Sequence, residues 1–201
     1  MKSKVPQFLV LFRLLLGPTM IFLTYKFGNE IRSELIVLLF LGLLSDVFDG
    51  IIARKLEIST EKLRRMDSQT DLVFWLCVGY CSWILNPEII IHNEYSIILI
   101  FVMEVMTYVL SITKFGKETC THALLSKLWG ITLLMAFVGI IGFGYSGITF
   151  ALAIIFGIIG HIDVFLIIYF LPKWTHDVPS CYHAYLIKNG IKIKRYKWFN
   201  G

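Results

Sequence analysis

The chain is poor in charged side chains. Asp, Glu, Lys and Arg make up 16% of its 201 residues, whereas hydrophobic residues make up 57% and the mean hydropathy is +0.73. A soluble domain is usually close to half apolar, and here the apolar residues come in long runs. The sequence also lacks internal repeats and low-complexity linkers. These absences argue against a separate soluble domain and predict one integral membrane domain.

The four cysteines are scattered, and no signal-peptide cleavage site is apparent near the N-terminus. Cys77 and Cys81 share a helical face, but no nearby Cys or His completes a zinc site, so we expect buried structural thiols. Lys2 and Lys4 precede an apolar run as in a signal peptide. However, no Ala-x-Ala-like cleavage site follows and Arg13 interrupts the run. We therefore expect a retained first helix.

Six apolar segments have the length of membrane-spanning helices. They cover residues 8–27, 33–55, 66–85, 94–113, 126–143 and 149–171. The fold class expected is an all-α integral membrane protein with six transmembrane helices. Gly17-Pro18 predicts a kink, or a break between an interfacial part and a spanning part of the first segment. Residues 1–172 would form the membrane domain and residues 173–201 a basic cytoplasmic tail.

The positive charges are distributed asymmetrically. If the N-terminus is cytoplasmic, all Lys and Arg except Lys26 and Arg32 fall on cytoplasmic segments, and the outer loops 86–93 and 142–147 have none. This bias predicts that both termini are cytoplasmic. The net charge of +5 then reflects topology and anionic membrane lipids rather than nucleic acid. We expect a multi-pass protein of the cell (inner) membrane whose active site faces the cytoplasm.

Four aspartates interrupt the apolar pattern. Asp46 and Asp49 are three residues apart, and Asp67 and Asp71 are four apart, so each pair lies on one face of its own helix. Four carboxylates beside an apolar phase need protons or cations. All-oxygen ligands favour a hard divalent ion, and Mg2+ is the first choice.

The stretch from 46 to 71 resembles the signature of the CDP-alcohol phosphatidyltransferases, D-x2-D-G-x2-A-R-x8-G-x3-D-x3-D. The matching residues are Asp46, Asp49, Gly50, Ala53, Arg54, Asp67 and Asp71, and Leu63 replaces the second glycine. The first helix resembles the phosphatidylglycerophosphate synthase branch, where Asn and Thr would replace Gln7 and Val10. This resemblance implies a membrane-embedded phosphotransferase that is commonly a homodimer.

The family reaction implies a role for each motif residue. A hydroxyl of an alcohol attacks the lipid-bearing phosphorus of CDP-diacylglycerol or another CDP-alcohol, and CMP leaves. Asp46, Asp49, Asp67 and Asp71 would hold two Mg2+ ions, with Mn2+ as a possible substitute, and Asp71 would also act as general base. Gly50, Ala53 and Arg54 would contact the nucleotide and its phosphates. Ser45, just before the motif, could also hydrogen-bond to the nucleotide, and a role in helix packing alone is equally open.

The acceptor is harder to predict. Lys117, His122 and Lys127 could bind a phosphorylated alcohol, although positive-inside topology alone explains the lysines equally well. Glycerol 3-phosphate is the first expectation, followed by inositol phosphate, inositol, serine or another lipid alcohol. Glu104, His161 and Asp163 lie within apolar segments, where acceptor binding and an interhelical polar contact are both open.

Three other classes of protein are alternatives to a CDP-alcohol phosphatidyltransferase. Intramembrane prenyltransferases also use aspartates and Mg2+, but resemble longer chains with two widely separated motifs. A cation transporter would place its site near the midplane, on broken helices, and would leave the Asp-Gly-x-x-Ala-Arg spacing unexplained. An inactive family member serving as a scaffold is suggested only by Leu63.

Overall fold

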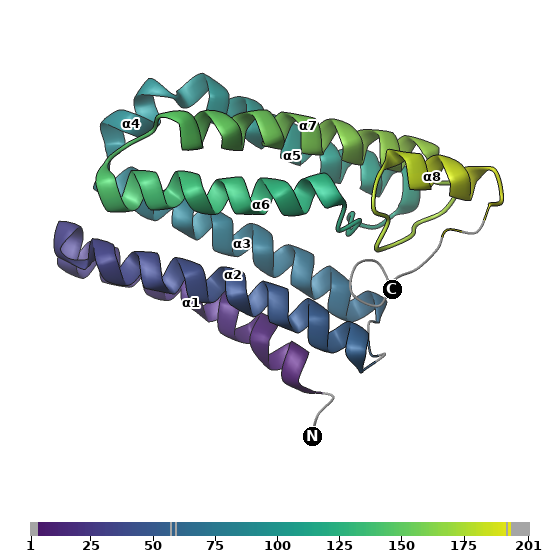
Figure 1. Cartoon of the computed structure of the whole chain (residues 1–201), viewed down its shortest axis with the longest axis horizontal. Coiled ribbons are helices and arrows are strands. Elements are labelled where there is room, and N and C mark those ends of the chain that lie inside the picture. The colour runs from purple at the N-terminus through teal and green to yellow at the C-terminus, as the bar shows by residue number, and fades with distance from the viewer. Residues whose placement is uncertain (1–3, 57, 59, 192, 194–201) are drawn as a thin grey trace. The chain divides into compact units, whose positions relative to one another are not determined.

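The computed structural model describes residues 4–56, 58, 60–191 and 193, and their regular structure is helical throughout (Figure 1). The elements are α1 (Val5–Phe27), η2 (Gly28–Ile31), α2 (Arg32–Lys55), α3 (Glu61–Leu85), α4 (Pro87–His92), α5 (Glu94–Phe115), α6 (Leu124–Phe137), η3 (Val138–Gly142), α7 (Ile148–Phe170) and α8 (Cys181–Lys188). The all-α class expected from the sequence is confirmed. Here η2 is a 3-10 helix and η3 a π-helical turn.

Four stretches of the described chain are long and apolar enough to span a membrane. They are Val5–Lys55, Glu94–Phe115, Leu124–Gly142 and Ile148–Phe170. The first contains α1, η2 and α2, which is more than one helix. Helix α3 is not among the four, and its first half carries most of its charges, including Asp67 and Asp71. The chain is therefore a multi-pass membrane protein, while six spans and cytoplasmic termini remain predictions.

The helices form two compact units. One contains the chain up to Glu94 together with Leu133–Ala151, and the other contains Tyr95–Thr132 together with the chain from Leu152 onward. Each unit has its own buried core, so the two are described separately.

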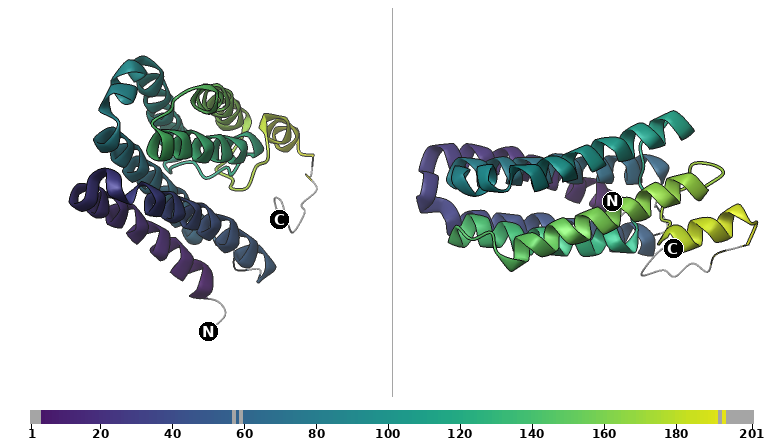
Figure 2. Two further views of the ribbon diagram at one scale, coloured as in Figure 1. Left: turned by 60° about the vertical axis from the view of Figure 1, so that its left-hand side comes forward. Right: turned by 90° about the horizontal axis from the view of Figure 1, so that it is seen from above.

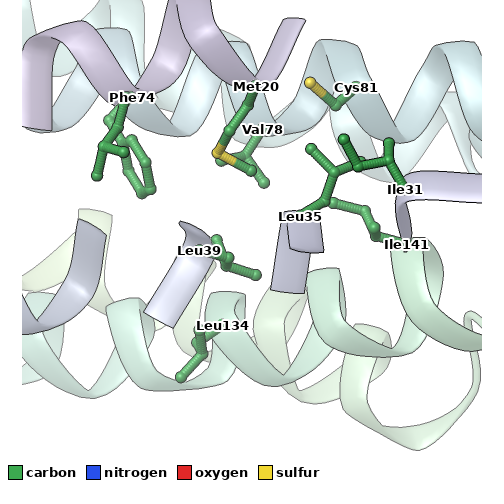
Figure 3. Packing of buried hydrophobic residues seen from close by; sticks show 10 residues of the cluster. Met20, Ile31, Leu35, Leu39, Phe74, Val78, Cys81, Leu134 and Ile141 are labelled. Atoms are coloured by element: carbon green, nitrogen blue, oxygen red, sulfur yellow. The ribbon is translucent and has the colours of Figure 1, made fainter. Parts of the chain in front are cut away.

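In the first unit, α1 packs against both α2 and α3, and the three helices run alongside one another (Figures 1 and 2). Their core includes Met20 of α1, Leu35 and Leu39 of α2, and Phe74 and Val78 of α3 (Figure 3). All five side chains are almost completely buried. This packing fixes the three helices that carry the charged residues described below.

Two glycines permit this close packing. A Cβ atom added to Gly42 would lie 2.2 Å from Cζ of Phe74, and one added to Gly17 would lie 2.9 Å from Sγ of Cys77. The sequence left open a kink or a break at Gly17-Pro18. The break is wrong, because α1 runs through Pro18 to Phe27. Gly17 allows α1 to approach α3 rather than ending a segment.

Helix α3 begins five residues earlier than the apolar pattern predicts. The side chain of Thr60 accepts a hydrogen bond from the backbone N–H of Leu63, which caps the first turn. The residues from Glu61 to Arg65 are mostly charged and show no apolar period, so the pattern alone could not find them. The motif aspartates of α3 therefore lie inside a capped helix.

The second unit contains a packed segment after α7. Leu171, Val178 of the connection and Ala184 of α8 belong to one buried cluster with residues of α7, and α8 lies near the C-terminal end of α7 (Figure 2). The backbone N–H of Val178 donates to the carbonyl of Thr121 over 2.8 Å, and that of Leu124 donates to Pro179 over 2.9 Å. The part of the predicted tail up to α8 is thus packed against the protein.

Candidate active site

Each of the first three long helices places a charged residue on its buried stripe. In α1 the stripe runs through Val10, Arg13, Gly17 and Met20 at spacings of three and four residues. In α2 the stripe includes Asp49, and in α3 it includes Asp67. Because α1 packs on both neighbours, one side chain of α1 can reach charges on both helices.

Arg13 lies among all four motif aspartates. Its Nη1 atom is 2.6 Å from Oδ1 of Asp46 and 2.7 Å from Oδ1 of Asp71. Its Nη2 atom is 2.9 Å from Oδ2 of Asp49 and 2.5 Å from Oδ1 of Asp67. The two aspartate pairs predicted from helical spacing therefore converge on one point.

The cluster has an open and a closed side. The side chains of Asp49 and Asp67 are only 4% and 5% exposed, whereas those of Asp46 and Asp71 are 37% and 30% exposed. Nη2 of Arg13 faces the closed pair and Nη1 faces the open pair. A molecule that approached this site would meet Asp46 and Asp71 first.

Arg13 does not balance the charge of the cluster. One guanidinium faces four carboxylates, so one positive charge set against four negative charges leaves an excess of three if all are ionised. A second buried arginine, Arg64, lies farther from the carboxylates, with its Nη1 4.0 Å from Oδ2 of Asp67. Several carboxylates held together in this way favour the binding of further cations.

The residues present fit a divalent cation. Asp46, Asp49 and Asp67 each offer one ligand atom, and these atoms lie within 4.8 Å of one another. Carboxylate oxygens are the ligands that Mg2+ and Mn2+ prefer. The donor set and the excess negative charge therefore both suit a hard metal ion at this position.

The residues expected to contact the nucleotide lie around the same part of α2. The hydroxyl of Ser45 is buried and donates to the carbonyl of Gly42 over 2.7 Å, a bond within its own helix. Nη1 of Arg54 lies 3.3 Å from the position of a Cβ atom at Gly50. Arg54 thus lies over the glycine backbone.

The position that departs from the family signature is also well defined. Leu63 is 7% exposed and belongs to one small buried cluster with Val10 and Ala53. Val10 is also a departure, because the phosphatidylglycerophosphate synthase branch would have Thr at this position of the first helix. Two departures from the pattern, 53 positions apart in the chain, thus lie in one apolar cluster that α1, α2 and α3 build together.

The three residues expected to bind the acceptor belong to the second unit. The Nζ atom of Lys117 lies 5.2 Å from the ring centre of Trp174, a cation–π contact. Nδ1 of His122 lies 3.2 Å from Oδ1 of the buried Asp177. Lys127 is exposed near the start of α6. Their role in binding an acceptor stays a prediction.

The central position of Arg13 does not follow from the sequence analysis, which treats Arg13 as a charge that interrupts the first apolar run. In the structure Arg13 is 1% exposed. A signal was present, because Arg13 follows Val10 by three residues and precedes Gly17 by four, as a residue of the same helical face does. The charges that Arg13 contacts depend on how α1 packs against α2 and α3, and the spacing of residues along the chain does not determine that packing.

Comparison with known proteins identifies one family. The family model for CDP-alcohol phosphatidyltransferase matches residues 3–159, which include Arg13 and all four aspartates. Neither the curated proteins nor the solved structures give a match.

Proposed function

The chain belongs to the CDP-alcohol phosphatidyltransferase family, and we propose that it transfers a phosphatidyl group from CDP-diacylglycerol to the hydroxyl of a polar alcohol. The family is a phosphotransferase family of phospholipid synthesis. The observation that supports the proposal best is the convergence of Asp46, Asp49, Asp67 and Asp71 around one cation position.

The proposed reaction exchanges one phosphorus–oxygen bond for another. The acceptor oxygen bonds to the phosphorus that carries the lipid, the bond from that phosphorus to the CMP oxygen breaks, and CMP leaves with the bonding electrons. The acceptor hydroxyl must lose its proton during the transfer. Asp71 suits the role of base, because its carboxylate is on the open side of the cluster.

Asp46, Asp49 and Asp67 would hold the divalent cation. When bound, this cation neutralises charge on the pyrophosphate and on the departing CMP. The protein side chains fix where that charge sits, since Asp49 and Asp67 are buried against the helices. Arg54, which lies over Gly50, is placed to pair with a phosphate of the nucleotide.

The acceptor proposed first is glycerol 3-phosphate, with inositol phosphate, inositol, serine or another lipid alcohol as alternatives. The basic residues Lys117, His122 and Lys127 suit a phosphorylated acceptor. Mg2+ is the proposed ion, two ions are expected, and Mn2+ should replace them. A homodimer and a cytoplasmic active site complete the proposal.

A CMP-release assay tests it. Purified protein in detergent would receive CDP-diacylglycerol, Mg2+ and one acceptor per reaction. We expect CMP with one acceptor, loss of that CMP with a chelator, and recovery on adding Mg2+ or Mn2+. CMP released equally with every acceptor and without metal would overturn the proposal. CDP-diacylglycerol that neither binds nor reacts would favour a transporter.

A further inference from the structure

We propose that Arg13 is a built-in counter-cation, which holds the aspartate cluster together in the metal-free protein and is displaced when a divalent cation binds. The inference rests on the proposed function, because it concerns the metal that this function requires. It assigns a role to a residue of α1, outside the Asp-Gly-x-x-Ala-Arg stretch.

The first support is that Arg13 and the metal would need the same oxygens. The guanidinium lies 2.5–2.9 Å from one oxygen of each of the four aspartates. Three of these carboxylates, those of Asp46, Asp49 and Asp67, also form the metal-ligating group. A metal ion needs these oxygens at about 2.0–2.6 Å. Two cations held by the same carboxylates also repel each other, so binding of one weakens binding of the other.

The second support is that Arg13 is held mainly by charge. Among the residues that the structure describes, Nε and Nη1 have no partner in hydrogen-bond geometry, although Nη1 is at ion-pair distance from Asp46 and Asp71. Only Nη2 makes true hydrogen bonds, to Asp49 and Asp67. A permanent structural arginine is expected to use more of its five donors. Arg13 is thus poised to give up this position.

The third support is the cost of an empty cluster. Without Arg13, four converging carboxylates repel one another, and two of them are buried. With Arg13 in place, the helices can pack before a metal arrives. Metal binding and the movement of Arg13 are therefore linked, because only molecules in which Arg13 has moved can bind the metal. The apparent metal affinity is the intrinsic affinity multiplied by the fraction of molecules in which Arg13 has moved.

Mn2+ binding tests this without relying on activity. Wild-type protein, Arg13→Met and Arg64→Met would be titrated with Mn2+ in detergent, and free Mn2+ measured by electron paramagnetic resonance. Met keeps most of the side-chain volume and removes the charge. Arg64 is the matched control, because it is also buried and its Nη1 lies 4.0 Å from Oδ2 of Asp67, farther than Arg13 lies from any of the four aspartates. A general effect of charge would change both variants alike.

We expect Arg13→Met to bind Mn2+ about tenfold more tightly or better, and Arg64→Met to change much less. With a chelator, Arg13→Met should unfold at a lower temperature than the wild type, and Mn2+ should restore it. Should Arg13→Met fail to fold even with Mn2+, Arg13→Lys replaces it; a single ammonium reaches fewer carboxylates, so binding should again tighten, but less.

The outcomes separate the two proposals. If the wild type binds Mn2+ and the Arg13 variants bind it no more tightly, the role of Arg13 is overturned and the proposed function stands. Equal tightening in the Arg64 control would also overturn the role of Arg13, because the effect would then be a general one of charge. A wild-type protein that binds no Mn2+ would overturn the proposed metal-dependent function, and the inference with it.

Discussion

Oε2 of Glu104 lies 2.8 Å from Nε2 of His161, a direct polar contact between α5 and α7. The other ring nitrogen of His161, Nδ1, lies 2.7 Å from the carbonyl oxygen of Gly157. A carbonyl can only accept, so Nδ1 must carry its proton. The pair therefore shares one further proton, held by either the imidazole or the carboxyl group. Of the two readings left open by the sequence, the structure shows the interhelical polar contact.

This contact predicts different results for two substitutions of Glu104. Glu104→Gln can still donate to Nε2 of a neutral His161, so we expect little change in stability. Glu104→Leu leaves Nε2 without this partner among apolar helices and should cost about 1–3 kcal/mol. Thermal unfolding of both variants in detergent measures the difference. Equal midpoints for the two would show that the contact does not stabilise the unit.

Much of the site could be predicted because it follows from local spacing. Asp46 with Asp49, and Asp67 with Asp71, share helix faces by virtue of their separation alone, and the apolar runs locate the long helices within a few residues. Arg13 could not be placed in the same way, since its partners are 33 to 58 positions away and are brought to it by packing. The short helices α4 and α8 were also missed, because six and eight residues do not establish a clear apolar period.

The aspartate cluster predicts a sharp loss of activity on neutralising one carboxylate. Asp71→Asn keeps the size of the side chain but removes its ability to take up a proton, so we expect CMP release to fall by about 100-fold or more. The matched control is Asp163→Asn. Of the roles left open for Asp163, the structure shows a packing contact, because its buried Oδ1 accepts a hydrogen bond from the backbone N–H of Cys181 over 2.9 Å. An amide oxygen can also accept this bond, so activity should be kept. Similar losses in both variants would contradict a specific role for Asp71.

Leu63 occupies the glycine position of the signature, and we expect its substitution to lower the stability of the protein rather than its activity. It packs with Val10 and Ala53 and is almost completely buried, so Leu63→Ala should cost about 2 kcal/mol or more. Leu128→Ala, at an exposed site of α6, should cost less. CMP release measured well below the unfolding temperature should persist in Leu63→Ala, because Leu63 is not one of the carboxylates. Loss of that activity in a folded variant would instead assign Leu63 to the substrate site.

Asp177 predicts an unusual order of stabilities. Its φ is 56°, and that of its partner His122 is 47°. Gly adopts this left-handed region freely, Asn, Asp and His tolerate it, and Ala adopts it only with strain. Its carboxylate also contacts two histidines, with Oδ1 3.2 Å from Nδ1 of His122 and Oδ2 2.7 Å from Nδ1 of His176. Removing the carboxylate loses both contacts, but only some replacements add strain.

We therefore expect Asp177→Asn to be mildest, since Asn tolerates this conformation and keeps one acceptor oxygen. Asp177→Gly loses the contacts without strain, whereas Asp177→Ala loses the contacts and adds strain of about 1 kcal/mol. Thermal unfolding in detergent, with limited proteolysis between α7 and α8 as a local readout, ranks the three. If Asp177→Gly were no more stable than Asp177→Ala, the connection would relax out of this conformation once the carboxylate is gone. The histidine contacts, rather than the packing of Val178 and Ala184, would then be what holds the backbone at Asp177.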